Sequence, residues 1–136
     1  MTPAQNKQII HRFVEECLNK KNLGAPLDEL VAEDFVEQVP FPGQGPGRAG
    51  LRDALLGFIA AFPDMLWKTQ EQIAEGDKVV SRFTFTGTHA GEFAGIKPTN
   101  KRVETWGVVI DVVRNGKMVE SRIIMDTAGL IRQING

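Results

Sequence analysis

Residues Lys101–Met125 read KRVETWGVVIDVVRNGKMVESRIIM, and this stretch decides the fold of the chain. Its two halves are rich in β-branched residues, as strands usually are. They are separated by Asn115-Gly116, the dipeptide that best fits a two-residue type I′ hairpin turn. The pattern therefore predicts two antiparallel strands, over residues 101–113 and 117–125.

Upstream of this hairpin the chain first continues the strand pattern and then changes period. Segments 65–74 and 78–88 predict two more antiparallel strands. Before Pro63 the apolar residues recur at helical spacing, and Thr2-Pro3 with Gln5 has the composition of a helix N-terminus. Before the strands we expect a helix from Pro3 to about Asn22, a short helix over 26–32, an extended piece over 34–39, a Pro/Gly-rich loop over 40–47 and a helix over 48–61. The tail, 127–134, predicts one or two helical turns.

Helices followed by antiparallel strands indicate an α+β fold of two layers, and residues 1–136 suit one domain. Sixteen basic against 17 acidic residues give a net charge of −1, which excludes an electrostatic case for nucleic acid or an anionic membrane. The one cysteine, Cys17, excludes an intrachain disulfide. No secretory leader or membrane span is recognisable, so we expect a cytoplasmic protein.

Four short stretches carry a family resemblance. They are Ala61-Phe62-Pro63-Asp64, AEGDKVV over 74–80, GTHAGEFAGI over 87–96, and Asp126 with Gly129, Leu130 and Gln133. With them the chain resembles the SnoaL-like polyketide cyclases of the NTF2-like superfamily, from about residue 5 to the end. The resemblance implies a conical, curved antiparallel sheet wrapped by three N-terminal helices, with a pocket on the concave face. It also implies a homodimer through the sheet and acid–base chemistry on a hydrophobic small molecule without metal or cofactor.

The chain departs from the family pattern at three positions where relatives carry polar chemistry. The carboxylate that aldol-type cyclases hold on the last strand falls at Ile123. A second polar pocket position falls at Val109, and an Asn of many relatives falls at Val39. The usual cyclase mechanism therefore cannot be carried over at these positions.

Strand alternation then predicts which side chains share the pocket face. In the strand predicted over residues 78–88, this face is expected to carry Arg82, Thr84 and Thr86. The expected pocket-lining residues are Phe13, Val39, Thr84, Thr105, Val109, Asp111, Ser121, Ile123 and Met125.

Two of the residues expected on this face are candidates for catalysis. Glu37 is expected to shuttle a proton, because apolar surroundings raise the pKa of a carboxyl group towards the useful range. Arg82 is expected to stabilise negative charge that develops on the substrate. The alternatives are a structural ion pair between the two residues or a solvent-facing position for each.

Other polar residues have structural interpretations. Asp126 directly precedes Thr127-Ala128-Gly129, where an N-cap for the terminal helix belongs. His89 lies in the glycine-rich signature and by strand parity leaves the pocket face. Trp67 and Trp106 suit packing in the core or an interface, with a stacking wall for a flat ligand as the alternative. Two isolated histidines do not form a metal site.

Two function classes follow from these residues. The first is a cofactor-free enzyme of the cyclase, isomerase or lyase type that acts by proton transfer on a hydrophobic, carbonyl-bearing substrate. The second is a non-catalytic binder of an apolar ligand, or a diverged or engineered family member, which the aliphatic residues Val39, Val109 and Ile123 favour.

Overall fold

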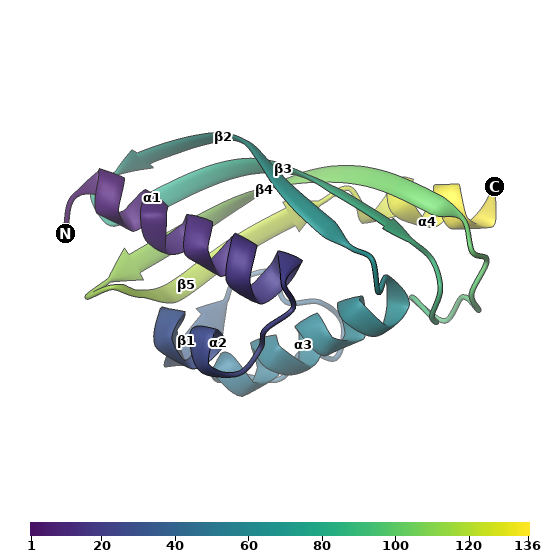
Figure 1. Cartoon of the computed structure of the whole chain (residues 1–136), viewed down its shortest axis with the longest axis horizontal. Helices are drawn as coiled ribbons and strands as arrows, with labels where there is room; N and C mark the ends of the chain where they lie inside the picture. The colour runs from purple at the N-terminus through teal and green to yellow at the C-terminus, as the bar shows by residue number, and fades with distance from the viewer.

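The structure is a computed structural model that describes residues 1–136. A five-stranded sheet with the order β1-β5-β4-β3-β2 forms one layer, and helices cover one of its faces (Figure 1). In chain order the elements are α1 (Pro3–Arg12), η1 (Phe13–Asn19), α2 (Ala25–Leu30), β1 (Val31–Glu37), α3 (Gly47–Ala61), β2 (Leu66–Glu75), β3 (Lys78–Thr88), β4 (Arg102–Arg114), β5 (Lys117–Met125) and α4 (Thr127–Asn135).

The four strands of the second half pair as an antiparallel meander, as the sequence predicts. Asn115 and Gly116 both have positive φ, which a type I′ turn requires at its two central residues. The first strand is different: β1 pairs with β5 in parallel, so the expectation of an antiparallel sheet is wrong at this edge. The chain reaches that edge through the N-terminal helices rather than through a hairpin, which allows the parallel direction.

A β-bulge in the β4–β5 hairpin sets which residues face each other. Next to the turn, Arg114 pairs with Lys117 and Val113 with Met118. The register then shifts by one residue, so that Asp111 pairs with Ser121 instead of Glu120. The extra residue on β5 thus places Ser121 on the inner face beside Asp111.

The N-terminal helix starts as the sequence predicts and continues differently. The Thr2 side chain accepts a hydrogen bond from the Gln5 amide, and the Gln5 side chain accepts one from the Thr2 amide, which completes a capping box. From Phe13 to Asn19, however, the chain forms a π-helix rather than a continued α-helix. This wider turn carries Phe13, Cys17 and Leu18 into the core.

The core lies between the helices and the concave face of the sheet. Helix α1 crosses the strands, while α4 and the C-terminus lie at the opposite end of the sheet from the N-terminus (Figure 1). The core cluster contains 23 buried hydrophobic residues, and Phe62, Phe85 and Leu27 are among the completely buried ones. Cys17 is also fully buried, and burial raises the pKa of its thiol to about 12.

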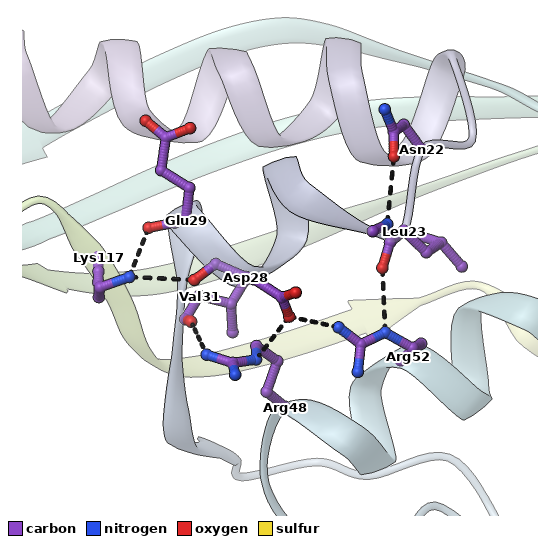
Figure 2. A network of polar contacts seen from close by, with 9 residues as sticks. Asn22, Leu23, Asp28, Glu29, Val31, Arg48, Arg52 and Lys117 are labelled. Carbon is purple, nitrogen blue, oxygen red and sulfur yellow. Dashed lines mark hydrogen bonds and ion pairs between the residues drawn. The ribbon is translucent and has the colours of Figure 1, made fainter.

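A polar network ties α2 to its neighbours (Figure 2). Both Arg48 and Arg52 of α3 form ion pairs with the Asp28 carboxylate. Each arginine also donates to a backbone carbonyl, of Val31 and Leu23 respectively. Lys117 of β5 donates to the carbonyls of Asp28 and Glu29 at the end of α2. The two Lys117 bonds satisfy carbonyls in the last turn of a six-residue helix that is too short to be stable alone, and the arginines hold the backbone on either side of it.

Replacing Asp28 by Asn is expected to lower the free energy of unfolding by about 1 kcal/mol, because two charge-assisted bonds become weaker and the carboxylate is half exposed. Denaturant titration at low and high salt measures the effect, which is expected to shrink as salt screens the pairs. Asp53→Asn, an exposed change on α3 outside the network, is the matched control. Equal losses in the two variants would contradict a role for the network.

Candidate functional site

An apolar cavity opens between the concave face of the sheet and the helices. Its open space is about 790 Å³ with the mouth included, and 14 of its 20 lining residues are hydrophobic. Six of these are aromatic: Phe13, Phe35, Phe41, Phe58, Trp67 and Phe83. Only two of the lining residues, Glu37 and Asp111, have ionisable side chains. Any charge that acts inside this cavity therefore comes from a carboxyl group.

The two carboxyl groups belong to one row across three neighbouring strands. Ser121 on β5 is the register partner of Glu37 on β1 and of Asp111 on β4. Register partners in adjacent strands point to the same side of a sheet, about 5 Å apart. All three residues line the cavity, so the sheet brings two acids and a hydroxyl together at its β1–β5–β4 end.

Glu37 is the last residue of β1 and is half-buried. Its Oε2 accepts hydrogen bonds from the backbone amides of Val39, at 3.0 Å, and Ile123, at 3.3 Å. Burial raises the pKa of Glu37, whereas these two amides and the Ser121 hydroxyl counteract the rise by favouring the charged form. Two backbone amides thus hold Oε2 in place at the end of β1.

Asp111 is more deeply buried, with only 2% of its surface exposed. Burial raises its pKa to about 7; the negative charge of Glu37 adds to the rise and the Ser121 hydroxyl opposes it. Its Oδ1 is buried without any hydrogen-bond partner. An unpartnered buried oxygen is costly, so this atom favours either a proton of its own or a hydrogen bond from a ligand.

Arg82 does not lie in the cavity, and the expectation that it shares the pocket face is wrong. In the β3–β4 pairing Val109, which lines the cavity, faces Ser81, while Arg82 faces Val108 on the outer surface of the sheet. There its Nε donates to Glu71 at 2.9 Å. An offset of one residue in register reverses every side chain of a strand, and alternation alone does not fix that offset.

The same offset moves Thr84 to the outer surface, where its hydroxyl accepts a hydrogen bond from Gln70. Three more of the expected pocket residues lie elsewhere. Val39 follows the end of β1 and is 46% exposed. Thr105 is on the inner face but beyond the cavity, and its hydroxyl donates to the Asp126 carbonyl. Met125 packs against the core without lining the cavity. The cavity does contain Phe13, Val109, Asp111, Ser121 and Ile123.

His89 and Asp126 both occupy structural positions. His89 is completely buried, its Nδ1 accepts from the Thr99 amide, and its ring lies 5.8 Å from the Phe62 ring. Asp126 is the N-cap of α4, with its carboxylate accepting from the Gly129 amide at 2.9 Å. Neither side chain lines the cavity.

The Pro/Gly-rich loop lies over the cavity and contributes Phe41 and Gln44 to its lining. The Phe41 ring packs edge-on against Phe58, at 5.0 Å between centroids. The loop also lies against α3 where Gly50 has no side chain: a Cβ there would come within 1.8 Å of the Gly45 carbonyl oxygen. The absence of a side chain at Gly50 thus allows this loop to pack directly against α3, close to the cavity.

Two residues have a larger part in the site than the sequence predicts. Asp111 was expected only as a lining residue, yet it is the most buried acid of the cavity. Its position between Val109 and Val113, within an apolar run, is the sequence signal for a buried carboxyl group. Trp67, for which the sequence favours packing with a stacking wall for a ligand as the alternative, packs against Phe83 and Phe85 and also lines the cavity.

No group of three or more His, Cys, Asp and Glu residues is arranged to hold a metal ion. None of the helices combines the length and the apolar character needed to span a bilayer.

Comparison with solved structures shows how common this arrangement is. The structure is similar to TsrD from Streptomyces laurentii, with a TM-score of 0.88 at 25% identity over 98% of this chain and 97% of that chain. It is also similar to IdmH from Streptomyces antibioticus, described as a candidate polyketide cyclase, with a TM-score of 0.84 at 31% identity over 97% and 99% of the two chains.

A third similar structure is AclR from Streptomyces galilaeus, described as a candidate hydroxylase, with a TM-score of 0.84 at 27% identity over 98% of both chains. No curated protein matches the sequence. The family model described as SnoaL-like polyketide cyclase matches residues 8–134, nearly the whole chain. With the curved sheet, the covering helices and the cavity between them, this match shows that the chain belongs to the SnoaL-like polyketide cyclase family, whose fold is NTF2-like.

Proposed function

We propose that this protein is a cofactor-free cyclase or isomerase that acts by proton transfer on a hydrophobic, carbonyl-bearing, polyketide-like small molecule. The observation that carries the proposal is the pair of carboxyl groups, Glu37 and Asp111, as the only ionisable groups lining an otherwise apolar cavity. The single buried cysteine suits a reducing, cytoplasmic location, which we propose with it.

The two acids have surroundings that suit opposite roles. Glu37 holds two backbone amides that favour its carboxylate, so it is assigned as the base that removes a proton next to the substrate carbonyl. Asp111 has an unpartnered oxygen and no such amides, so it retains its proton more firmly. A carboxyl group kept neutral by apolar surroundings can donate to the oxygen of a developing enolate. Asp111 thus has the role that the sequence predicts for Arg82, which is to stabilise negative charge that develops on the substrate.

The experiment begins with ligand binding. The melting temperature is measured with a panel of hydrophobic ketones, esters and polyketide mimics, and the stabilising compounds are then incubated and analysed for products. A ligand at about 100 times its Kd is expected to stabilise the fold by roughly 2.7 kcal/mol. Products that form with the native protein, and not with protein in which both acids are replaced by amides, would support the proposal.

A non-catalytic ligand binder is the second candidate, favoured by the aliphatic residues Val109 and Ile123 in the cavity. Such a protein would be stabilised by a ligand without converting it. Replacing the two acids by their amides would then change only affinity. Binding without any product across the panel would favour this function over the enzyme.

We also propose that two copies associate through the outer face of the sheet. This face exposes Trp106, by 53%, and Ile124, by 68%, beside the partly exposed Val108 and Ile110. Ile124→Glu is expected to convert the dimer to a monomer in sedimentation, because it places a charge in an apolar interface. Val39→Glu, an exposed change off the sheet, is the matched control. A native protein that sediments as a monomer would contradict the dimer.

A further inference from the structure

Ser121 occupies the middle of the acidic row, with its hydroxyl within hydrogen-bonding reach of the Glu37 and Asp111 carboxyl groups. It is 5% exposed and lines the cavity. Glu37 lies opposite it on one side and Asp111 on the other. The one-residue shift between Val112 and Val113 is what brings Ser121 to this position. Without the bulge, Glu120 would face Asp111, and Ser121 would point to the outer face of the sheet.

A count of donors shows what a serine can do there. A hydroxyl has one proton to donate and two lone pairs to accept with, while an ionised carboxylate only accepts. Two ionised carboxylates would therefore compete for one donor. When one of the two carboxyl groups carries a proton, that group can donate to Oγ while Oγ donates to the other. The singly protonated pair is thus the state that a serine at this position satisfies fully.

We propose that Ser121 is a positioning residue that bridges Glu37 and Asp111 and passes a proton between them. Its use in turnover rests on the proposed function. In the enolisation step, Glu37 takes the carbon-bound proton of the substrate and Asp111 gives its own proton to the carbonyl oxygen. Ser121 then gives its proton to Asp111 and takes one from Glu37. The carboxylate on Glu37 and the acid on Asp111 are restored, and Ser121 is unchanged.

The rest of the cavity offers no other ionisable group to this pair. Helix α1 and η1 present Ile10, Phe13, Val14 and Leu18, α3 presents Leu51, Leu55 and Phe58, and the loop presents Phe41 and Gln44. The strands add hydroxyl groups at Thr69 and Ser81. Ser81 is buried as deeply as Ser121, but it faces Val109 and accepts from Gln72 rather than standing between two acids. It is therefore a matched control.

The test is a carboxyl-carbon NMR titration of the ligand-free protein labelled in Asp and Glu. The native pair is expected to titrate in two separated steps, because the bridge favours the singly protonated state. Ser121→Ala is expected to bring the two apparent pKa values of the pair closer together, which narrows the interval between them. The lower of the two is expected to rise by about one pH unit, a tenfold change in that ionisation constant. Ser121→Thr keeps a hydroxyl and is expected to keep the interval, as is Ser81→Ala.

Three results would overturn the bridge: an unchanged interval in Ser121→Ala, an equal narrowing in Ser81→Ala, or a shift of one carboxyl signal with none in the other. If the alanine variant does not fold, Ser121→Cys fills the same space with a weak donor and is expected to narrow the interval in the same way. The titration needs no substrate. A narrowed interval in a protein that turns nothing over would leave the bridge standing and refute the enzyme.

Discussion

Glu37→Gln is expected to reduce turnover of any substrate by about 10²–10⁴-fold, the usual contribution of one positioned acid–base group. Glutamine has nearly the same shape, and its carbonyl oxygen can still accept from the amides of Val39 and Ile123. The variant therefore keeps the end of β1 in place and loses only the ability to take a proton. Product formation by chromatography, with the melting temperature as a check on folding, measures the result.

The control for this prediction is Arg82→Gln. That side chain was the other catalytic candidate of the sequence, and it lies on the outer surface with Glu71. Its replacement is expected to leave kcat and KM within about twofold, since it touches neither the cavity nor the acids. A large loss of kcat in Arg82→Gln, or full activity in Glu37→Gln, would show that the chemistry takes place elsewhere.

Asp111→Asn is expected to change the pH dependence of stability more than any other neutral substitution in this chain. The pKa of Asp111 is about 7 in the folded protein, against an ordinary value of 3.8. Between these two pH values the folded state binds more protons than the unfolded state, so the free energy of unfolding falls as pH rises. The stabilising contribution of the neutral acid is present below pH 4 and is lost by about pH 7.

The full difference between the two values corresponds to about 4 kcal/mol, at 1.4 kcal/mol per pH unit. Urea unfolding of the native protein and of Asp111→Asn at pH values from 4 to 8 is expected to show a gap that grows in favour of the variant over this range. All other carboxyl groups are common to both proteins, and those that do not interact with Asp111, as Glu37 does, cancel in the comparison. Parallel profiles would mean that Asp111 titrates as an ordinary aspartate.

The sequence was sufficient for the order and type of most elements because their signals are local. The Asn115-Gly116 turn, the capping box at Thr2 and the N-cap at Asp126 each act within a few residues. The π-helix from Phe13 and the parallel pairing of β1 were missed. Both depend on what the segment packs against rather than on its own composition.

The site was harder to predict because it depends on register. Strand alternation placed Asp111 and Ser121 on the inner face correctly, but it placed Arg82 and Thr84 there as well. The predicted register of β3 is off by one residue, and in a strand such an offset moves every side chain to the opposite face of the sheet. Phe83 and Phe85 supply the physical reason for the true register, since two large aromatic side chains must be buried and Arg82 need not be.

The rate at which a reagent modifies the buried Cys17 thiol reports how often η1 separates from the sheet. The thiol is fully covered, and with a pKa of about 12 it is almost entirely unreactive in the closed molecule. A thiol reagent can therefore modify it only during the moments when η1 separates from the sheet. Since η1 also supplies Phe13 and Leu18 to the cavity wall, the rate of Cys17 modification measures how often this wall opens. A compound that slows the labelling thereby reveals itself as an occupant of the cavity before any reaction is known.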